Sequence, residues 1–123
     1  MPALRLEHVN ITVADPDAAA RLMSEIFGWR VRWQGPAMSG GRSVHVGADD
    51  HYLALYAPPE GASAFPKGQP LNHIGVEVDD LAAVEARVVA AGLSTFSHGE
   101  YHPGRRFYFL DPNGVEYEVV SYA

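Results

Sequence analysis

The sequence predicts an α+β fold made of two modules, each with the element order βαβββ, and two observations lead to this prediction. First, the segment LEHVNITVAD near the start of the chain recurs in its second half as LNHIGVEVDD, which indicates an internal duplication. Second, both copies alternate between apolar and polar residues, as a strand with one buried face does, and a helical pattern follows each. We therefore expect one domain over residues 1–123, with modules at about 4–57 and 71–122 and a linker at 58–70 rich in Pro, Gly, Ala and Ser.

The repeat marks the first strand of each module. Its apolar rows are Val9, Ile11 and Val13 in the first copy and Ile74, Val76 and Val78 in the second. Successive side chains of a strand point to opposite faces. His8 and His73, which occupy matching places in the repeat, therefore face away from these apolar rows.

A helix is expected after each of these strands. In the first module Asp15 can cap the helix, Pro16 suits its first position and Gly28 ends it. In the second module Asp79 or Asp80 is the cap and Gly92 the end. Apolar residues recur along both segments at helical spacing, so each helix can cover the apolar face of the strand before it.

The rest of each module reads as short strands separated by turns. The expected strands are Trp29–Gln34, Arg42–Gly47 and His51–Ala57 in the first module, and Leu93–Ser97, Arg105–Leu110 and Val115–Tyr122 in the second. The turn DPNG joins the last two strands as a hairpin.

Composition excludes several classes of protein. Apolar residues make up 47% of the chain and charged residues 20%, which argues against disorder. The net charge of −6 argues against a nucleic-acid partner, because such binding depends on Lys and Arg. With no cysteine, no transmembrane stretch and an N-terminus unlike a signal peptide, we expect a cytoplasmic protein without a membrane partner.

The polar faces of the predicted strands suggest a metal site. If the two modules are related by a pseudo-twofold axis, His8 and His73 are equivalent inward-facing residues. On the last strand Glu116 and Glu118 share the face opposite the apolar residues, and either could add a carboxylate. Two imidazoles and one carboxylate form a facial triad that leaves positions open for water, oxygen or substrate.

Three segments of the chain resemble the vicinal oxygen chelate superfamily. They are LEHVNITVADPD with its helix ending in FGW, NHIGVEVDDL in mid-chain, and FYFLDPNGVEYEVV near the end. That superfamily includes glyoxalase I, bleomycin-resistance proteins, fosfomycin-resistance transferases, methylmalonyl-CoA epimerase and extradiol dioxygenases. The resemblance implies paired βαβββ modules whose mixed sheets curl into a cup around a metal. It also implies that modules pair between the subunits of a homodimer.

By position, the resemblance assigns the metal ligands to His8, His73 and Glu118, for a divalent ion such as Fe²⁺, Mn²⁺, Ni²⁺ or Zn²⁺. In a shared site, His8 would come from one chain and His73 with Glu118 from the other. Glyoxalase I and the epimerase carry a further Glu or Gln on the last strand of the first module. The repeat places Ala54 there, and a methyl group cannot bind metal or move a proton.

The resemblance to extradiol enzymes also suggests catalytic residues. Tyr108 lies ahead of Glu118 at the spacing of their catalytic tyrosine, and His98 and His102 lie near their acid/base histidine. Tyr108 can equally be a packing residue and the two histidines solvated loop residues. For substrate binding, the candidates are Asn10 on the face of His8, and Arg105 or Arg106, of which only one can face the cup and bind an anionic group.

We therefore expect a metal-dependent enzyme for a small-molecule substrate that binds the metal through two oxygens. A dioxygenase-like reaction is favoured over a glyoxalase-type lyase or isomerase, because of Ala54 and Tyr108. The alternative from another class is a metal-free module that binds a cationic or aromatic antibiotic, as bleomycin-resistance proteins do.

Overall fold

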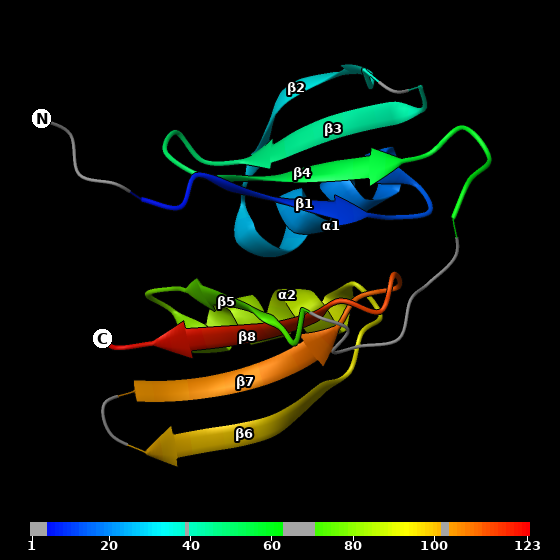
Figure 1. Ribbon diagram of the computed structural model, residues 1–123. Coiled ribbons are helices and arrows are strands. Elements are labelled where there is room, and N and C mark those ends of the chain that lie inside the picture. Colours follow the sequence, from blue (N-terminus) through cyan, green and yellow to red (C-terminus); the bar gives the residue numbers. More distant parts are fainter. Residues whose placement is uncertain (1–4, 39, 63–70, 102–103) are drawn as a thin grey trace, which may run out of the picture. The chain divides into compact units, whose positions relative to one another are not determined.

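A computed structural model describes residues 5–38, 40–62, 71–101 and 104–123 of the chain. The chain divides into two compact units, Met1–Ser63 and Ala64–Ala123. The α+β class and the βαβββ order predicted from the repeat are both confirmed, because each unit contains one helix and a four-stranded mixed sheet (Figure 1).

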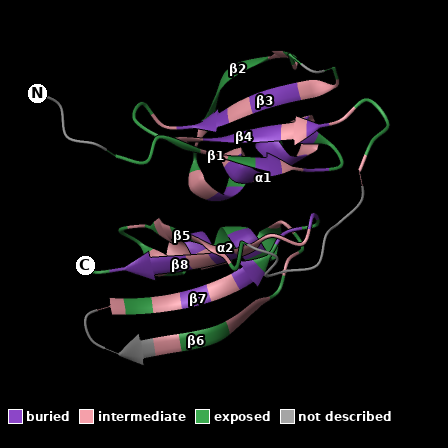
Figure 2. Ribbon diagram, viewed as in Figure 1, coloured by how far each residue is buried: buried purple, intermediate pink, exposed green. Residues whose placement is uncertain are grey.

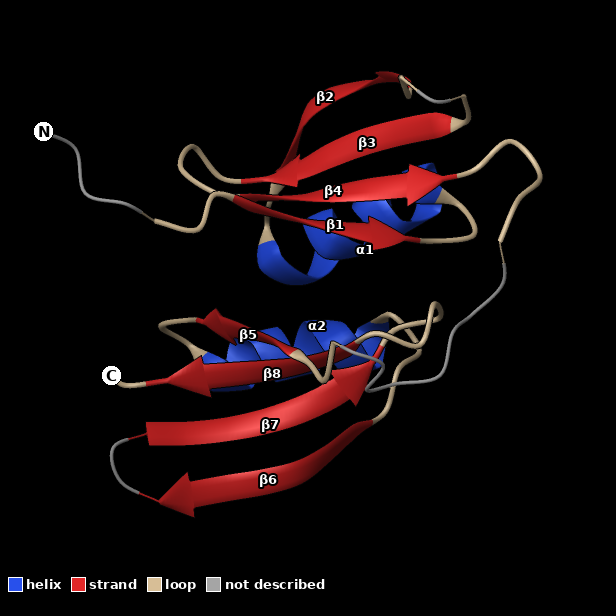
Figure 3. Ribbon diagram, viewed as in Figure 1, coloured by secondary structure: helices blue, strands red, loops and turns tan. Residues whose placement is uncertain are grey.

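The first unit forms its sheet in the order β1-β4-β3-β2, with β1 parallel to β4 and the other pairs antiparallel. Its elements are β1 (His8–Thr12), α1 (Pro16–Phe27), β2 (Arg30–Pro36), β3 (Arg42–Gly47) and β4 (Tyr52–Ala57). Helix α1 lies along one face of this sheet (Figure 3). Burial is greatest in the central strands β3 and β4 and least in the edge strand β2 (Figure 2).

The second unit repeats this topology with the strand order β5-β8-β7-β6. Its elements are β5 (Ile74–Glu77), α2 (Leu81–Ala90), β6 (Thr95–Tyr101), β7 (Gly104–Leu110) and β8 (Glu116–Ser121). Strand β5 is parallel to β8, and the remaining pairs are antiparallel. The core consists of apolar side chains that alternate along the strands, together with the helix residues that cover them: Val84, Val88, Phe107, Phe109, Tyr117 and Val119.

The helix boundaries follow from the capping residues. The Asp15 carboxylate accepts a hydrogen bond from the Ala18 amide at 3.1 Å, and Gly28 ends α1 in the left-handed conformation at φ 72°. In the second unit Asp80, the second of the two predicted candidates, caps α2 by accepting from the Ala83 amide at 3.0 Å.

The turn between β7 and β8 is held by Asp111. Its buried carboxylate accepts hydrogen bonds from the amides of Asn113 and Val115, each at 2.9 Å. Burial raises the pKa of this carboxyl group, and the bonds from the two amides oppose that effect. The turn sets the register of the hairpin, in which Tyr108 lies directly across from Glu118.

Strand β6 differs from the prediction, which ended it at Ser97. The strand continues to Tyr101 because its ladder with β7 contains a bulge between Phe96 and Gly99. Ser97 in this bulge has a positive φ of 55°, which shifts the facing of the residues that follow. His98 therefore lies within a strand and not in a loop.

Candidate functional site

Two of the three predicted metal ligands meet in the second unit. His73 directly precedes β5, and Glu118 lies on β8, the strand with which β5 pairs. The Nε2 atom of His73 is 3.0 Å from the Oε1 atom of Glu118. Both side chains are partly shielded from solvent, with exposed fractions of 34% for His73 and 14% for Glu118.

The orientation of His73 is set by its other ring nitrogen, Nδ1, which lies 2.8 Å from the side-chain oxygen of Asn72. When Nδ1 donates its proton to that oxygen, the lone pair of a neutral imidazole is on Nε2 and faces the Glu118 carboxylate. Because Nε2 of His73 and Oε1 of Glu118 would each present a lone pair at this distance, a proton or a cation must lie between the two atoms. The contact of Nδ1 with Asn72 is of the kind that orients histidines bound to a metal.

The spacing of these two atoms fits a shared metal ion. A ligand nitrogen and a ligand oxygen, each about 2.1 Å from a divalent ion and at right angles to each other, are about 3.0 Å apart. Glu116, the other carboxylate that the sequence left open, is farther away, with its Oε2 4.0 Å from the Nδ1 of His73. The donor set of His73 and Glu118 therefore fits a divalent metal ion.

Arg106 and Tyr108 border this pair on β7. Arg106 donates from Nη1 to Oε2 of Glu118 at 2.7 Å, and its side chain is 11% exposed. The ring of Tyr108 approaches that of His73 edge-on, with centroids 5.8 Å apart. Of the two neighbouring arginines, Arg106 thus lies on the Glu118 side of the sheet, whereas Arg105 is exposed and alternates to the other face.

His98 is not brought together with Tyr108 and Glu118. Its Nε2 lies 2.6 Å from Oε2 of Glu85 on α2, and Thr95 donates to the same oxygen at 2.6 Å. These bonds lower the pKa of the Glu85 carboxyl group, the bond from Thr95 most. His98 therefore faces the helix, on the side of the sheet away from Tyr108. His102, the other predicted acid/base candidate, lies outside the described residues.

The first unit contributes His8 and Asn10 on one face of β1. The His8 ring stacks on that of Tyr52, with centroids 4.8 Å apart and planes 12° apart, and its Nδ1 is 3.0 Å from Oε1 of Glu7. Asn10 is exposed and pairs in register with Ala54. Since His8 belongs to the other unit, its convergence with His73 and Glu118 stays a prediction.

The registers support the alignment of Ala54 with Glu118. Asn10 pairs with Ala54 across β1 and β4, and Gly75, which matches Asn10 in the repeat, pairs with Glu118 across β5 and β8. The first unit thus has a methyl group where the second has its carboxylate.

His45, which was not among the predicted site residues, lies on β3 directly across from Ala54. Its ring stacks on Tyr52 with centroids 4.7 Å apart and lies 5.1 Å from that of Trp33. The alternation of SVHV places His45 on the polar face of its strand. When the two modules are aligned by the registers of their strands, His45 matches Tyr108.

No group of three or more His, Cys, Asp or Glu side chains able to hold a metal ion is found within residues 5–38, 40–62, 71–101 and 104–123. His8, the predicted third ligand, lies in the first unit. In the same ranges, none of the helices has the length and apolarity to cross a membrane.

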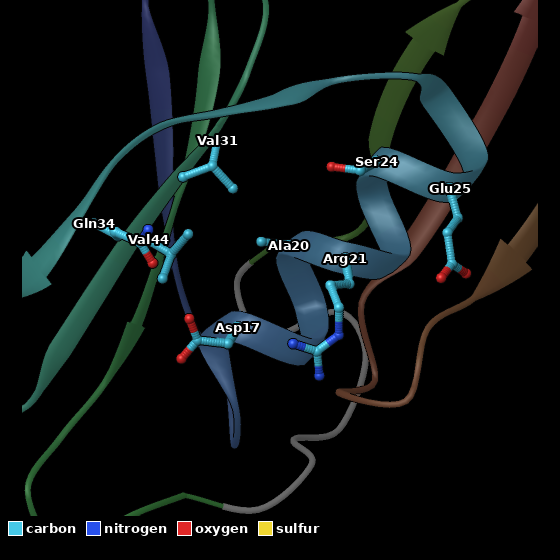
Figure 4. A pocket seen from close by; sticks show the side chains of 8 residues that line it. All are labelled: Asp17, Ala20, Arg21, Ser24, Glu25, Val31, Gln34 and Val44. Atoms are coloured by element: carbon cyan, nitrogen blue, oxygen red, sulfur yellow. The ribbon is translucent and has the colours of Figure 1, made fainter.

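A groove of about 370 Å³ lies elsewhere in the first unit, between α1 and strands β2 and β3 (Figure 4). It contains none of the predicted site residues. Its lining is mixed in character: Asp17, Ala20, Arg21, Ser24, Glu25, Val31, Gln34 and Val44.

The superfamily of the chain follows from a match to a protein-family model. The model of the Glyoxalase/Bleomycin resistance protein/Dioxygenase superfamily matches residues 5–119. The chain belongs to this superfamily. Among the curated proteins, none matches the chain.

Several solved structures share the fold of the chain. A glyoxylase/bleomycin resistance protein/dioxygenase domain from Frankia sp. EAN1pec is 23% identical, with a TM-score of 0.85 and coverage of 98% of each chain. The antibiotic-binding protein TnmS3 from Streptomyces sp. CB03234 is 21% identical, with a TM-score of 0.77 and coverage of 100% of this chain and 99% of its own. The fosfomycin resistance protein FosX from Listeria monocytogenes, in complex with Mn(II) and sulfate, is 17% identical, with a TM-score of 0.77 and coverage of 98% and 93%.

Proposed function

We propose that the chain is a divalent-metal-dependent enzyme acting on a small substrate that binds the metal through two neighbouring oxygens. The observation that carries this proposal is the 3.0 Å approach of His73 Nε2 to Glu118 Oε1, with His73 oriented by Asn72. His8 is the proposed third ligand. A cation held there would supply positive charge to polarise the bound oxygens.

The residues around the pair have defined parts in this proposal. Arg106 holds one oxygen of Glu118, which leaves the other oxygen for the metal. Tyr108, across the ladder from Glu118, can donate a hydrogen bond to a substrate oxygen. We favour a dioxygenase-like reaction over a glyoxalase-type one, because Ala54 replaces the second carboxylate that the latter would use for proton transfer and because Tyr108 lies beside the ligands.

We further propose that the chain forms a homodimer in which His8 of one subunit joins His73 and Glu118 of the other. Among the described residues, β1 and β5 are edge strands that pair only with β4 and β8. Each unit is small, and a chain of about 60 residues buries too little surface to be very stable by itself.

Metal titration tests the enzyme proposal. The protein is freed of metal with a chelator and titrated with Mn(II), while free Mn(II) is followed by electron paramagnetic resonance. We expect one ion per chain, and an affinity reduced by at least about 10-fold in Glu118→Gln, since a neutral amide replaces an anionic ligand. The matched control is Glu77→Gln, which changes an exposed carboxylate on β5.

Unchanged Mn(II) affinity in Glu118→Gln would remove Glu118 from the site. Absence of stoichiometric binding by the unaltered protein, repeated with Fe(II), Ni(II) and Zn(II), would overturn the enzyme proposal.

A second candidate function is a metal-free module that binds an aromatic antibiotic. The observation in its favour is the set of rings on one face of the first sheet, where His45 contacts both Trp33 and Tyr52 and where Trp33 is 47% exposed. Tight binding of bleomycin to the metal-free protein, seen as quenching of tryptophan fluorescence that is lost in Trp33→Ala, would favour this function over the enzyme.

A further inference from the structure

The groove beside α1 lies on the face of the first sheet that this helix covers (Figure 4). Two features make room for its volume of about 370 Å³. The helix presents the short side chains of Ala20 and Ser24 to the groove. The ladder of β2 with β3 contains a bulge between Val31 and Trp33. This bulge brings Val31 and Gln34, which would face opposite ways in a regular strand, to the same side of β2.

One end of the groove is fixed by Arg42, which lies on β3. Its Nε and Nη2 atoms donate to the two carboxylate oxygens of Asp17, each at 2.8 Å. Nη2 also donates to Oε1 of Gln34 at 2.8 Å. Because the oxygen of the Gln34 amide accepts from Arg42, its nitrogen is the atom that can donate to a ligand. This end of the groove therefore holds an oriented hydrogen-bond donor.

The charges at this end favour an anion. Asp17 is ionised at neutral pH, because the hydrogen bonds from Arg42 lower the pKa of its carboxyl group and the charge of Arg21 acts in the same direction. Arg42 and Arg21 thus place two positive charges beside one negative charge. Arg21 lines the groove one helical turn after Asp17, and a guanidinium group can bind a carboxylate through two parallel hydrogen bonds.

The rest of the groove suits an apolar group and disfavours a second negative charge. Ala20 and Val44 form buried parts of its lining, and Val31 contributes an apolar side chain that is 43% exposed. Glu25 lines the groove one helical turn beyond Arg21, and its carboxylate repels an anion. A ligand with one carboxylate and a short apolar tail therefore matches both the charges and the lining.

We propose that this groove binds a small monocarboxylate. Arg21 and the amide nitrogen of Gln34 bind the carboxylate, and the hydroxyl of Ser24 is a further donor. The apolar tail covers Val31, so that the binding removes exposed apolar surface from water. This inference goes beyond the proposed metal site and does not depend on it, because all the residues of the groove belong to the first unit.

Nuclear magnetic resonance tests the ligand class. The full chain, isotope-labelled and kept free of metal by a chelator, is titrated with isocaproate while the backbone amide signals are followed. Isocaproamide has the same shape without the charge, and glutarate adds a second carboxylate. We expect saturable shifts in α1, β2 and β3 with isocaproate. Isocaproamide and glutarate should bind about fivefold more weakly, the order of effect of one exposed ion pair.

Two variants test the location of the site. Arg21→Gln removes the positive charge and should weaken isocaproate binding by about fivefold. Ser24→Leu fills the groove with a side chain that helices accept well, and it should abolish the binding. The matched control is Arg5→Gln, which changes an exposed arginine outside the groove and should bind isocaproate like the unaltered protein.

Absence of saturable shifts with isocaproate would overturn the site. Equal binding of isocaproate and isocaproamide would overturn the assignment of a carboxylate. Shifts that persist undiminished in both Arg21→Gln and Ser24→Leu would show that the acid binds elsewhere. The amide spectra report whether each variant is folded, and Arg21→Gln decides alone if Ser24→Leu is not. Since metal is absent throughout, none of these outcomes bears on the metal titration that tests the proposed function.

Discussion

Glu118 is the side chain on which the polar contacts of the second unit converge. One of its oxygens faces His73 at 3.0 Å, and the other accepts from Arg106 at 2.7 Å. Because Glu118 is 14% exposed and Arg106 11% exposed, water screens this ion pair poorly. In the absence of metal, Arg106 thus stabilises the Glu118 carboxylate. Its positive charge also repels a cation that approaches this carboxylate.

Replacing Arg106 by Gln should therefore have two opposite effects. Without metal, we expect the free energy of unfolding to fall by about 2–4 kcal/mol, because a largely buried carboxylate loses its partner. The affinity for Mn(II) should rise by about tenfold, because a positive charge near the cation is removed. Urea unfolding with chelator present and Mn(II) titration measure the two effects.

The exposed neighbour provides the control for this experiment. Arg105→Gln should leave both the unfolding free energy and the Mn(II) affinity unchanged, since Arg105 lies on the other face of β7. Weaker Mn(II) binding by Arg106→Gln would contradict the opposed roles and show that Arg106 only positions Glu118.

Residue type and alternation predicted the facing of His73 and Glu118, because a regular strand alternates its side chains. They did not predict which of Arg105 and Arg106 contacts Glu118, since that choice depends on the register between β7 and β8. Alternation places His45 on the polar face of its strand, but its position across from Ala54 depends on the pairing of β3 with β4, which the local sequence does not contain.

At the scale of elements, the capped helices were predictable and the bulge in β6 was not. Asp15, Gly28 and Asp80 act locally, so the helix ends can be read from neighbouring residues. The bulge depends on a non-glycine residue, Ser97, with positive φ, a conformation that sequence rarely signals. Its consequence is large, because it turns His98 toward Glu85.

Helix α1 is tied to its sheet by a two-pronged ion pair. Arg42 on β3 donates from Nε and Nη2 to the two carboxylate oxygens of Asp17, each at 2.8 Å. These hydrogen bonds lower the pKa of Asp17. A carboxyl group with a lowered pKa in the folded state adds stability above its ordinary pKa, and this is lost as the pH falls through the folded-state pKa.

Asp17→Asn should accordingly destabilise the protein at pH 7 by no more than about 1 kcal/mol, since both side chains are roughly two-fifths exposed. The difference from the unaltered protein should shrink as the pH falls below the ordinary aspartate pKa of about 3.9. Urea unfolding at pH 7 and at successively lower pH values measures it, with Glu60→Gln as an exposed control. A difference that persists undiminished at low pH would mean that the ion pair is not its source.

At the scale of the whole molecule, the internal repeat was enough to predict two βαβββ units, because duplicated segments adopt the same local structure. The meeting of His8 with His73 and Glu118 is a different kind of claim. Alternation says which face of a sheet a side chain occupies, but it does not say which faces come together. The pair of His73 and Glu118 lies within one unit and is visible there, whereas His8, the proposed third ligand, belongs to the other unit.

A mixture of two variants, each lacking one proposed metal ligand, tests whether the proposed metal site is shared between subunits. His8→Ala and Glu118→Gln each lack one proposed ligand, so neither should bind Mn(II) tightly alone. In a dimer with shared sites, a mixed pair places both defects in one site and leaves the other site with its native His8, His73 and Glu118. We therefore expect the mixture, after unfolding and refolding together, to regain tight binding in its mixed dimers at one ion per dimer.

If each metal site lies within a single chain, the mixing experiment should give the opposite result. Each subunit of the mixed pair would then contain one defect, and no tight binding would return at any mixing ratio. The double variant His8→Ala/Glu118→Gln, refolded with unaltered protein, separates the cases again: a shared arrangement leaves no intact site in the mixed dimer, whereas a single-chain arrangement leaves one. A shared site thus predicts one intact site in each mixed dimer of the first mixture and none in each mixed dimer of the second. A general effect of refolding on metal affinity would act on both mixtures alike and cannot imitate this result.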